Sequence, residues 1–93
     1  MGVEDMAASL KDKVENGDFD SSIKFVTGDG VLVIDGSSIS TEDQETACTV
    51  KVSSDDLQSI IDGDLDPTAA FMQGKLSVEG DMGVAMKLGS LLG

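Results

Sequence analysis

Several residue types that carry chemistry are missing from this sequence. It contains no histidine, arginine, tryptophan or tyrosine, and only one cysteine, Cys48. A single cysteine excludes an intramolecular disulfide, and without histidine Cys48 has no partner base that would make it a nucleophile. A general acid–base pair would need two carboxylates that converge in a partly dry cleft, but nearly all the carboxylates fall at predicted caps, turns and polar strand faces. The sequence therefore argues against an enzyme and predicts no cofactor and no bound metal.

Aromatic residues and long apolar runs are also scarce. The three aromatics are Phe19, Phe25 and Phe71, so the interior has to be built from valine, isoleucine, leucine and the five methionines. Unbranched methionine side chains repack around different shapes, which suits a pocket for apolar ligands as well as a plain core. The longest aliphatic run, residues 31–34, is far short of the roughly 20 residues that a membrane-spanning helix needs.

Positive charge is the third scarcity. Six lysines stand against eighteen aspartates and glutamates, for a formal net charge of -12. Such a charge repels phosphate backbones and anionic lipid surfaces, so it argues against a nucleic-acid partner and allows at most transient membrane contact. We attribute the acidity to solubility rather than to a dedicated basic partner. The length suits one domain, residues 1–93, with room for one core.

Apolar residues recur at helical spacing near the start of the chain and predict an amphipathic helix that ends at Asn16 and Gly17. Its apolar stripe consists of Val3, Met6, Ala7, Leu10 and Val14. Its polar face mixes acidic side chains with two lysines, whereas a helix that grips anionic membranes is rich in lysine and arginine. We therefore expect this helix to pack on a sheet.

Alternating apolar and polar residues predict five strands. The segments are residues 21–27, 31–35, 37–41, 46–52 and 75–79. Gly28 and Gly30 supply a turn between the first two segments, which therefore form a hairpin. The third segment has only Ile39 as an apolar anchor, so we expect a short edge strand. Cys48 lies on the buried side of the fourth.

Two short helices separate the last two strands, and a further helix follows the fifth. Ser53 and Asp56 form a capping-box start for the first short helix, which Gly63 ends. Asp66 is a suitable N-cap for the second, with Pro67 in its first turn. The apolar residues of the final helix are Val84, Leu88, Leu91 and Leu92, with Met82 and Met86 one turn apart beside them.

Residues 62–66 also resemble the opening of a calcium-binding loop. Such a loop needs a glycine at its sixth position and a glutamate at its twelfth, where this chain has Pro67 and Gln73. Both requirements fail, so we interpret the segment as a linker between two helices.

This order of elements indicates an α+β fold. Consecutive strands should pair as an antiparallel meander, giving a five-stranded, mainly antiparallel sheet that helices cover on one face. The surplus of apolar residues from Phe71 to Leu92 predicts an internal cavity on the order of a few hundred Å³ beneath those helices. Spacing alone favours the simpler interpretation that these residues are packed core.

The last third of the chain carries a resemblance that spacing does not supply. Residues 66–76, DPTAAFMQGKL, and residues 80–88, GDMGVAMKL, resemble the closing segment of sterol carrier protein type 2 domains, the nonspecific lipid-transfer family. The resemblance extends more weakly through residues 47–50 and 54–57, so that about half of the chain is similar in motif. Members of this family hold one apolar lipid in a tunnel between a sheet and its covering helices. The resemblance therefore implies a lipid carrier with an apolar tunnel.

The resemblance also implies which residues contact the lipid. Carried over position by position, the tunnel or near-tunnel residues are Phe71, Met72, Leu76, Met82, Val84, Met86 and Leu88. Gln73 is the implied polar handle for a headgroup or hydroxyl. The implied ligand is a fatty acid, a fatty acyl-CoA, a phospholipid or a sterol-like molecule, carried without catalysis.

Two other functions stay open at this stage. One is a structural or regulatory interaction protein whose tunnel has collapsed into packed core, and the other is an accessory domain that presents lipid to a partner enzyme. Residues 1–5 lack the basic and apolar regions of a signal peptide, and the final residues lack the peroxisomal address that many eukaryotic members carry. We therefore expect a bacterial, cytoplasmic protein.

Overall fold

The structure, a computed structural model, describes residues 2–17 and 19–92, and in the last helix it describes side chains as far as Leu88. The helices are α1 (Val3–Asn16), α2 (Ser54–Ile61), α3 (Pro67–Met72) and α4 (Met82–Leu92). The strands are β1 (Ser22–Thr27), β2 (Gly30–Asp35), β3 (Ser38–Ser40), β4 (Cys48–Val52) and β5 (Leu76–Gly80). Every predicted helix and strand is present within about two residues of its expected bounds. The side chains of Leu91 and Leu92, placed in the apolar stripe of the last helix by the sequence, lie outside the described part.

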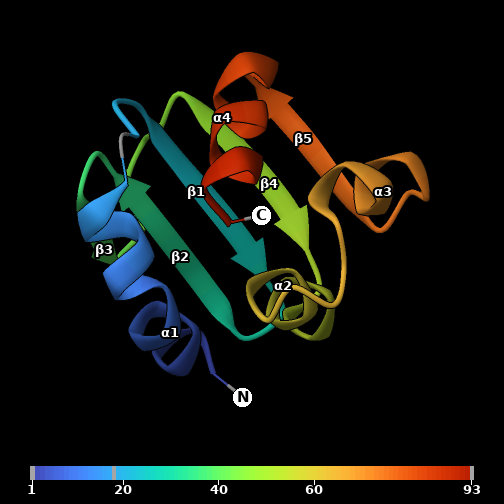
Figure 1. Ribbon diagram of the computed structural model, residues 1–93, viewed down its shortest axis with the longest axis horizontal. Helices are drawn as coiled ribbons and strands as arrows, with labels where there is room; N and C mark the ends of the chain where they lie inside the picture. Colours follow the sequence, from blue (N-terminus) through green and yellow to red (C-terminus); the bar gives the residue numbers. More distant parts are fainter. Residues whose placement is uncertain (1, 18, 93) are drawn as a thin grey trace.

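The strands form one sheet in the order β3-β2-β1-β4-β5 (Figure 1). Antiparallel pairs join β1 to β2, β2 to β3, and β4 to β5. By contrast, β1 and β4 run parallel, with Ile23 opposite Cys48. The mainly antiparallel sheet is therefore confirmed, but the expectation that all consecutive strands pair as a meander is wrong between β3 and β4.

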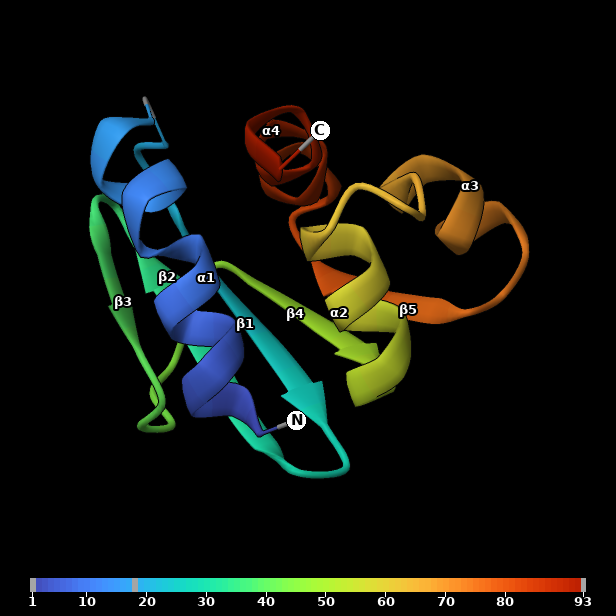
Figure 2. The same cartoon turned by 60° about the horizontal axis from the view of Figure 1, so that its bottom comes forward.

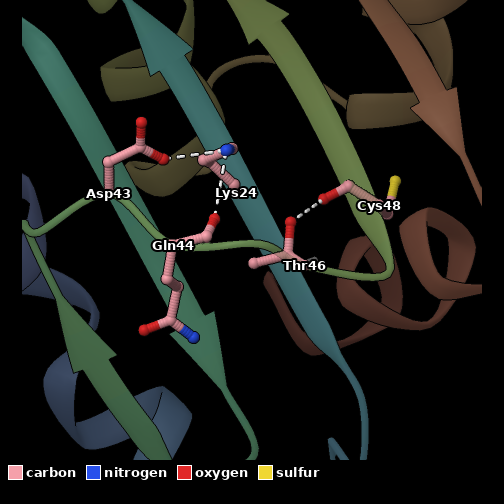
Figure 3. A network of polar contacts seen from close by, with 5 residues as sticks. All are labelled: Lys24, Asp43, Gln44, Thr46 and Cys48. Carbon is pink, nitrogen blue, oxygen red and sulfur yellow. Dashed lines mark hydrogen bonds and ion pairs between the residues drawn. The ribbon is translucent and has the colours of Figure 1, made fainter.

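A crossing loop, residues 41–47, explains this topology. It returns from β3 to the end of the sheet at which β1 begins, so β4 enters parallel to β1. Figure 3 shows how Lys24 holds the loop: its Nζ lies 2.8 Å from Asp43 Oδ1 and donates to the Gln44 carbonyl oxygen at 3.1 Å. At the end of the loop, the Ala47 backbone N–H donates to the Ser22 hydroxyl oxygen at 2.9 Å. These contacts join segments that are far apart in the sequence, so no local sequence pattern predicts them.

The helices of the described chain all lie on the other face of the sheet (Figure 2). α1 packs over β2 and β3, α4 packs over β4, β1 and β5, and α3 contacts β5 and α4. The fully buried core side chains come from both layers and include Met6, Leu10, Val14, Leu32, Ile34, Leu57 and Leu88. The predicted cover of helices on one face is thus confirmed. Within the described residues, we find no helix that combines the length and the apolar character needed to cross a membrane.

Candidate functional site

A cavity lies between the sheet and helices α2, α3 and α4. Its volume is about 390 Å³, within the range of roughly 300 to 1,000 Å³ that is usual for ligand pockets. Its wall consists of Ile23, Phe25, Val50, Ile60, Asp66, Pro67, Thr68, Phe71, Leu76, Val78, Met82, Ala85, Met86 and Leu88. All of these except Asp66 and Thr68 are apolar, so the described wall suits hydrocarbon.

Three strands make the floor of the cavity. In the parallel pair, Phe25 of β1 lies opposite Val50 of β4, and Val50 in turn lies opposite Val78 of β5. Successive side chains of a strand point to opposite faces, so Ile23 and Phe25 point toward the helices while Lys24 points toward the crossing loop. The parallel pairing of β1 with β4 is therefore what brings an aromatic ring from the first hairpin under the last third of the chain.

The cavity exists because α3 is too small to fill the space above β5. This helix has six residues and buries only Ala70, whose side chain is a single methyl group. Asp66 caps its start, with Asp66 Oδ1 accepting from the Thr68 backbone N–H at 2.9 Å, and Gly74, at a φ of 75°, follows its end. A residue with a β-carbon rarely adopts that φ, so Gly74 turns the chain into β5 at that point.

Exposed side chains on the wall mark where the cavity opens to solvent. Phe71 on α3 is 43% exposed, and Met82 and Met86 on α4 are 44% and 73% exposed, although all three line the cavity. α3 and α4 contact one another along this side. The mouth of the cavity therefore lies along these two helices. An enclosed tunnel stays a prediction.

The structure brings five of the predicted site residues to the cavity: Phe71, Leu76, Met82, Met86 and Leu88. Val84 is buried in the core beside them and does not line the wall. Met72 is 80% exposed, and Gln73 is exposed at the C-cap of α3. Successive residues of a helix are about 100° apart around its axis, so Met72 points away from the cavity that Phe71 lines. Gln73 does not line the wall either, and its role as a polar handle for a headgroup stays a prediction.

Sequence reasoning missed the rest of the wall. The floor residues of β1 and β4 carried a clear signal for a buried strand face, but alternation does not say which helices cover that face. Asp66 and Thr68 were missed for another reason. A helix start fully accounts for the pair Asp66 and Pro67. The local sequence therefore gives no sign that this helix start also lies on a cavity wall.

Cys48 lies close to the cavity without lining it. Burial raises the pKa of its thiol, the negative charge of Asp81 raises the pKa further, and a backbone hydrogen bond from Ala85 partly opposes both effects. The thiolate is the reactive form of cysteine, so these surroundings hold Cys48 in its unreactive form. The predicted buried thiol is confirmed.

Comparison with known proteins gives a consistent family and fold. A model of the SCP-2 sterol transfer family matches residues 3–93. Sterol carrier protein 2 of Rattus norvegicus is 43% identical to this chain over 56 residues, which cover 60% of this chain and 10% of the rat protein. The match to sterol carrier protein 2 of the rabbit, Oryctolagus cuniculus, likewise covers 10% of that protein's length, so these curated relatives are much longer than this chain.

Solved structures extend the likeness over the whole architecture. The sterol carrier protein domain 2 of Helicoverpa armigera is 27% identical with a TM-score of 0.66, over 96% of this chain and 77% of that one. The complex of sterol carrier protein 2 from Aedes aegypti with palmitate is 19% identical with a TM-score of 0.77, over 96% of this chain and 92% of that one. The α+β fold is shared across these proteins.

Proposed function

This chain belongs to the SCP-2 sterol transfer family, and we propose that it binds one lipid molecule in the cavity between sheet and helices and carries it without changing it chemically. The observation that carries this proposal is the cavity of about 390 Å³ with its apolar wall. Burial of apolar ligand surface contributes about 25 cal/mol per Å². A wall with few directional groups therefore binds hydrocarbon with broad specificity. The Aedes aegypti protein, which has the same fold and was solved with palmitate, supports this use of the fold.

Carriage without catalysis is supported by the composition of the wall. A general acid–base pair needs two groups that converge on the substrate, whereas the described wall contains one carboxylate, that of Asp66. Cys48, the single thiol, is buried and has a raised pKa. Nothing in this set activates a nucleophile. A bacterial, cytoplasmic setting and the treatment of residues 1–93 as one domain stay predictions from the sequence.

A second candidate function is an accessory domain that presents lipid to a partner enzyme. The matching segment is 10% of the length of rat sterol carrier protein 2, so this kind of domain occurs as part of longer chains. The cavity serves both functions equally. They differ in whether lipid is handed to a membrane or to an attached or associated catalytic domain.

The test of lipid binding compares substitutions at two exposed methionines, Met86 and Met72. Native mass spectrometry of protein purified from its own host should show a co-purified lipid, and the uncharged fluorescent reporter N-phenyl-1-naphthylamine should bind the delipidated protein. Met86→Trp puts a bulky ring at the cavity wall, and we expect it to weaken reporter binding by about tenfold or more while the melting temperature changes little.

Met72→Trp is the matched control for this experiment. Met72 is at least as exposed as Met86 but does not line the cavity, so the same substitution should leave reporter binding unchanged. Equal losses at both positions would contradict binding in this cavity. Failure of the wild-type protein to bind the reporter or any acyl or sterol competitor would favour the interaction protein with a collapsed tunnel.

A further inference from the structure

The polar groups on the cavity wall are few and lie together at the start of α3. Among the described residues of the wall, Asp66 is the charged one and Thr68 supplies the other polar side chain. Both are exposed, so they lie where the cavity meets solvent. A lipid whose chain fills the apolar part of the cavity keeps its polar headgroup near water, and Asp66 and Thr68 are the polar side chains that it meets on the wall.

Positive charge is missing from the same place. The chain has no arginine, and none of its six lysines is on the described wall. Ion pairs with carboxylates hold three of the lysines elsewhere: Lys24 with Asp43, Lys51 with Glu79, and Lys87 with Asp20. Lys75 directly precedes Leu76 of the wall, but it is exposed and does not line the cavity. Among the described residues of the wall, an anionic headgroup would therefore meet a carboxylate and no lysine.

The N-cap bond fixes the orientation of the Asp66 carboxylate. Its Oδ1 accepts from the Thr68 backbone N–H at 2.9 Å, which ties the group to the start of α3. A carboxylate has a second oxygen and accepts hydrogen bonds without donating any. It can therefore accept from the O–H of an alcohol or the N–H of an ammonium group, and it repels another carboxylate or a phosphate.

We propose that Asp66 sets the headgroup preference of this site, which takes lipids with a hydrogen-bond donor and no negative charge, such as long-chain alcohols and amines, ahead of fatty acid anions. The inference rests on the proposed lipid-binding function and narrows it. Of the ligands that the family resemblance implied, a sterol-like alcohol fits this mouth. A fatty acid anion and a fatty acyl-CoA, which is a polyanion, are disfavoured.

The experiment compares three ligands with the same hydrocarbon chain: dodecanol, dodecylammonium and dodecanoate. Each is used to displace N-phenyl-1-naphthylamine, whose binding does not depend on charge. Salt is held at about 0.15 M, where the Debye length of about 8 Å screens distant carboxylates. One like charge at contact distance in high dielectric changes affinity by about fivefold. We therefore expect the alcohol and the ammonium to bind at least about fivefold more tightly than the carboxylate.

Two asparagine substitutions isolate the role of Asp66. Asp66→Asn removes the charge and keeps an N-cap acceptor of similar quality, so it should tighten dodecanoate and weaken dodecylammonium, each by about fivefold, and change dodecanol little. Asp64→Asn changes the net charge by the same amount at an exposed position that is not on the wall. It should leave the ratios among the three ligands as they are in the wild type.

The outcomes separate this inference from the proposed function. If all three ligands displace the reporter equally well from the wild type, or if dodecanoate binds best, the headgroup preference is overturned while lipid binding stands. Equal effects of the two asparagine variants would also overturn it. If the reporter and all three ligands fail to bind, the proposed function itself fails. If circular dichroism shows that Asp66→Asn does not fold, the wild-type comparison still decides whether the headgroup preference exists, and Asp66→Ser, which keeps a good N-cap residue without the charge, tests the role of Asp66.

Discussion

In both halves of the helical layer, apolar side chains of helices pack on the sheet. The two halves differ in how completely those side chains fill the space between helices and sheet. On one side, the fourteen-residue helix α1 packs an apolar stripe against β2 and β3. Its Met6, Leu10 and Val14 are fully buried. On the other side of the layer lie α3 and α4 (Figure 2). There the six-residue α3 buries only Ala70, and Met86 of α4 stays exposed at a cavity. A long continuous stripe closes its half of the layer, whereas two helices joined through a strand leave room for a ligand.

The largest expected effect on stability is in the closely packed half of the layer, where α1 covers β2 and β3. Leu10→Ala removes a fully buried side chain from α1, and we expect the free energy of unfolding to fall by about 2 to 5 kcal/mol. Urea denaturation followed by circular dichroism measures the change. A loss below about 1 kcal/mol, far under the usual cost of such a cavity, would show that α1 is as loosely packed as the cavity side.

The next largest effect on stability is expected at the end of β5, a strand that lies beneath the cavity. At Gly80, φ is 98° and a β-carbon would lie 2.6 Å from the Ala47 carbonyl oxygen, which itself accepts from the Asp81 backbone N–H at 3.1 Å. Gly80→Ala should therefore destabilise the protein by about 1 to 3 kcal/mol or more. Gly36, at a φ of 60° with open space around it, is the matched control. If Gly36→Ala costs as much as Gly80→Ala, the contact with Ala47 is not tight.

A smaller effect should appear at alkaline pH through Cys48. Burial, reinforced by Asp81, raises the pKa of its thiol in the folded protein, so the unfolded chain loses the proton first as pH rises. The stabilisation is thus fully present below the unfolded pKa of about 8.5 and declines above it, by at most about 1.4 kcal/mol per pH unit. Cys48→Ala should remove this part of the decline in the free energy of unfolding. Urea titrations at pH values below and above the unfolded pKa of the thiol measure it. An unchanged decline in that variant would show that the cavity side admits water to the thiol.

The smallest effect belongs to the mouth of the cavity. Met86 is largely exposed, so Met86→Ala should change the free energy of unfolding by less than about 0.5 kcal/mol, while it widens the cavity and shifts ligand preference toward bulkier chains. Urea denaturation and reporter displacement measure the two effects. A loss of stability comparable to that of Leu10→Ala would mean that Met86 is packed core and that the two sides do not differ.

Most of the local structure was predictable because its causes lie within a few residues. The stripe containing Met6, Leu10 and Val14 identified α1, and the pair Asp66 and Pro67 identified the start of α3. The candidate site was predictable only in part. The family resemblance supplied the α4 positions that line the cavity. It also included Met72 and Gln73, which follow Phe71 at the end of α3 and do not line the cavity.

By itself, the sequence determined where helices and strands begin and end, which faces are apolar, and that the molecule is acidic, because periodicity, caps and charge are properties of neighbouring residues. The tertiary structure decided which strand β4 joins and therefore which side chains share the cavity. Phe25 and Val50 meet only because the crossing loop, held by Lys24, returns the chain to lie parallel to β1. The cap residue Asp66 also lies on the cavity wall, beside these strands of the floor. Contacts between residues this far apart depend on the whole packed layer, so no local pattern encodes them.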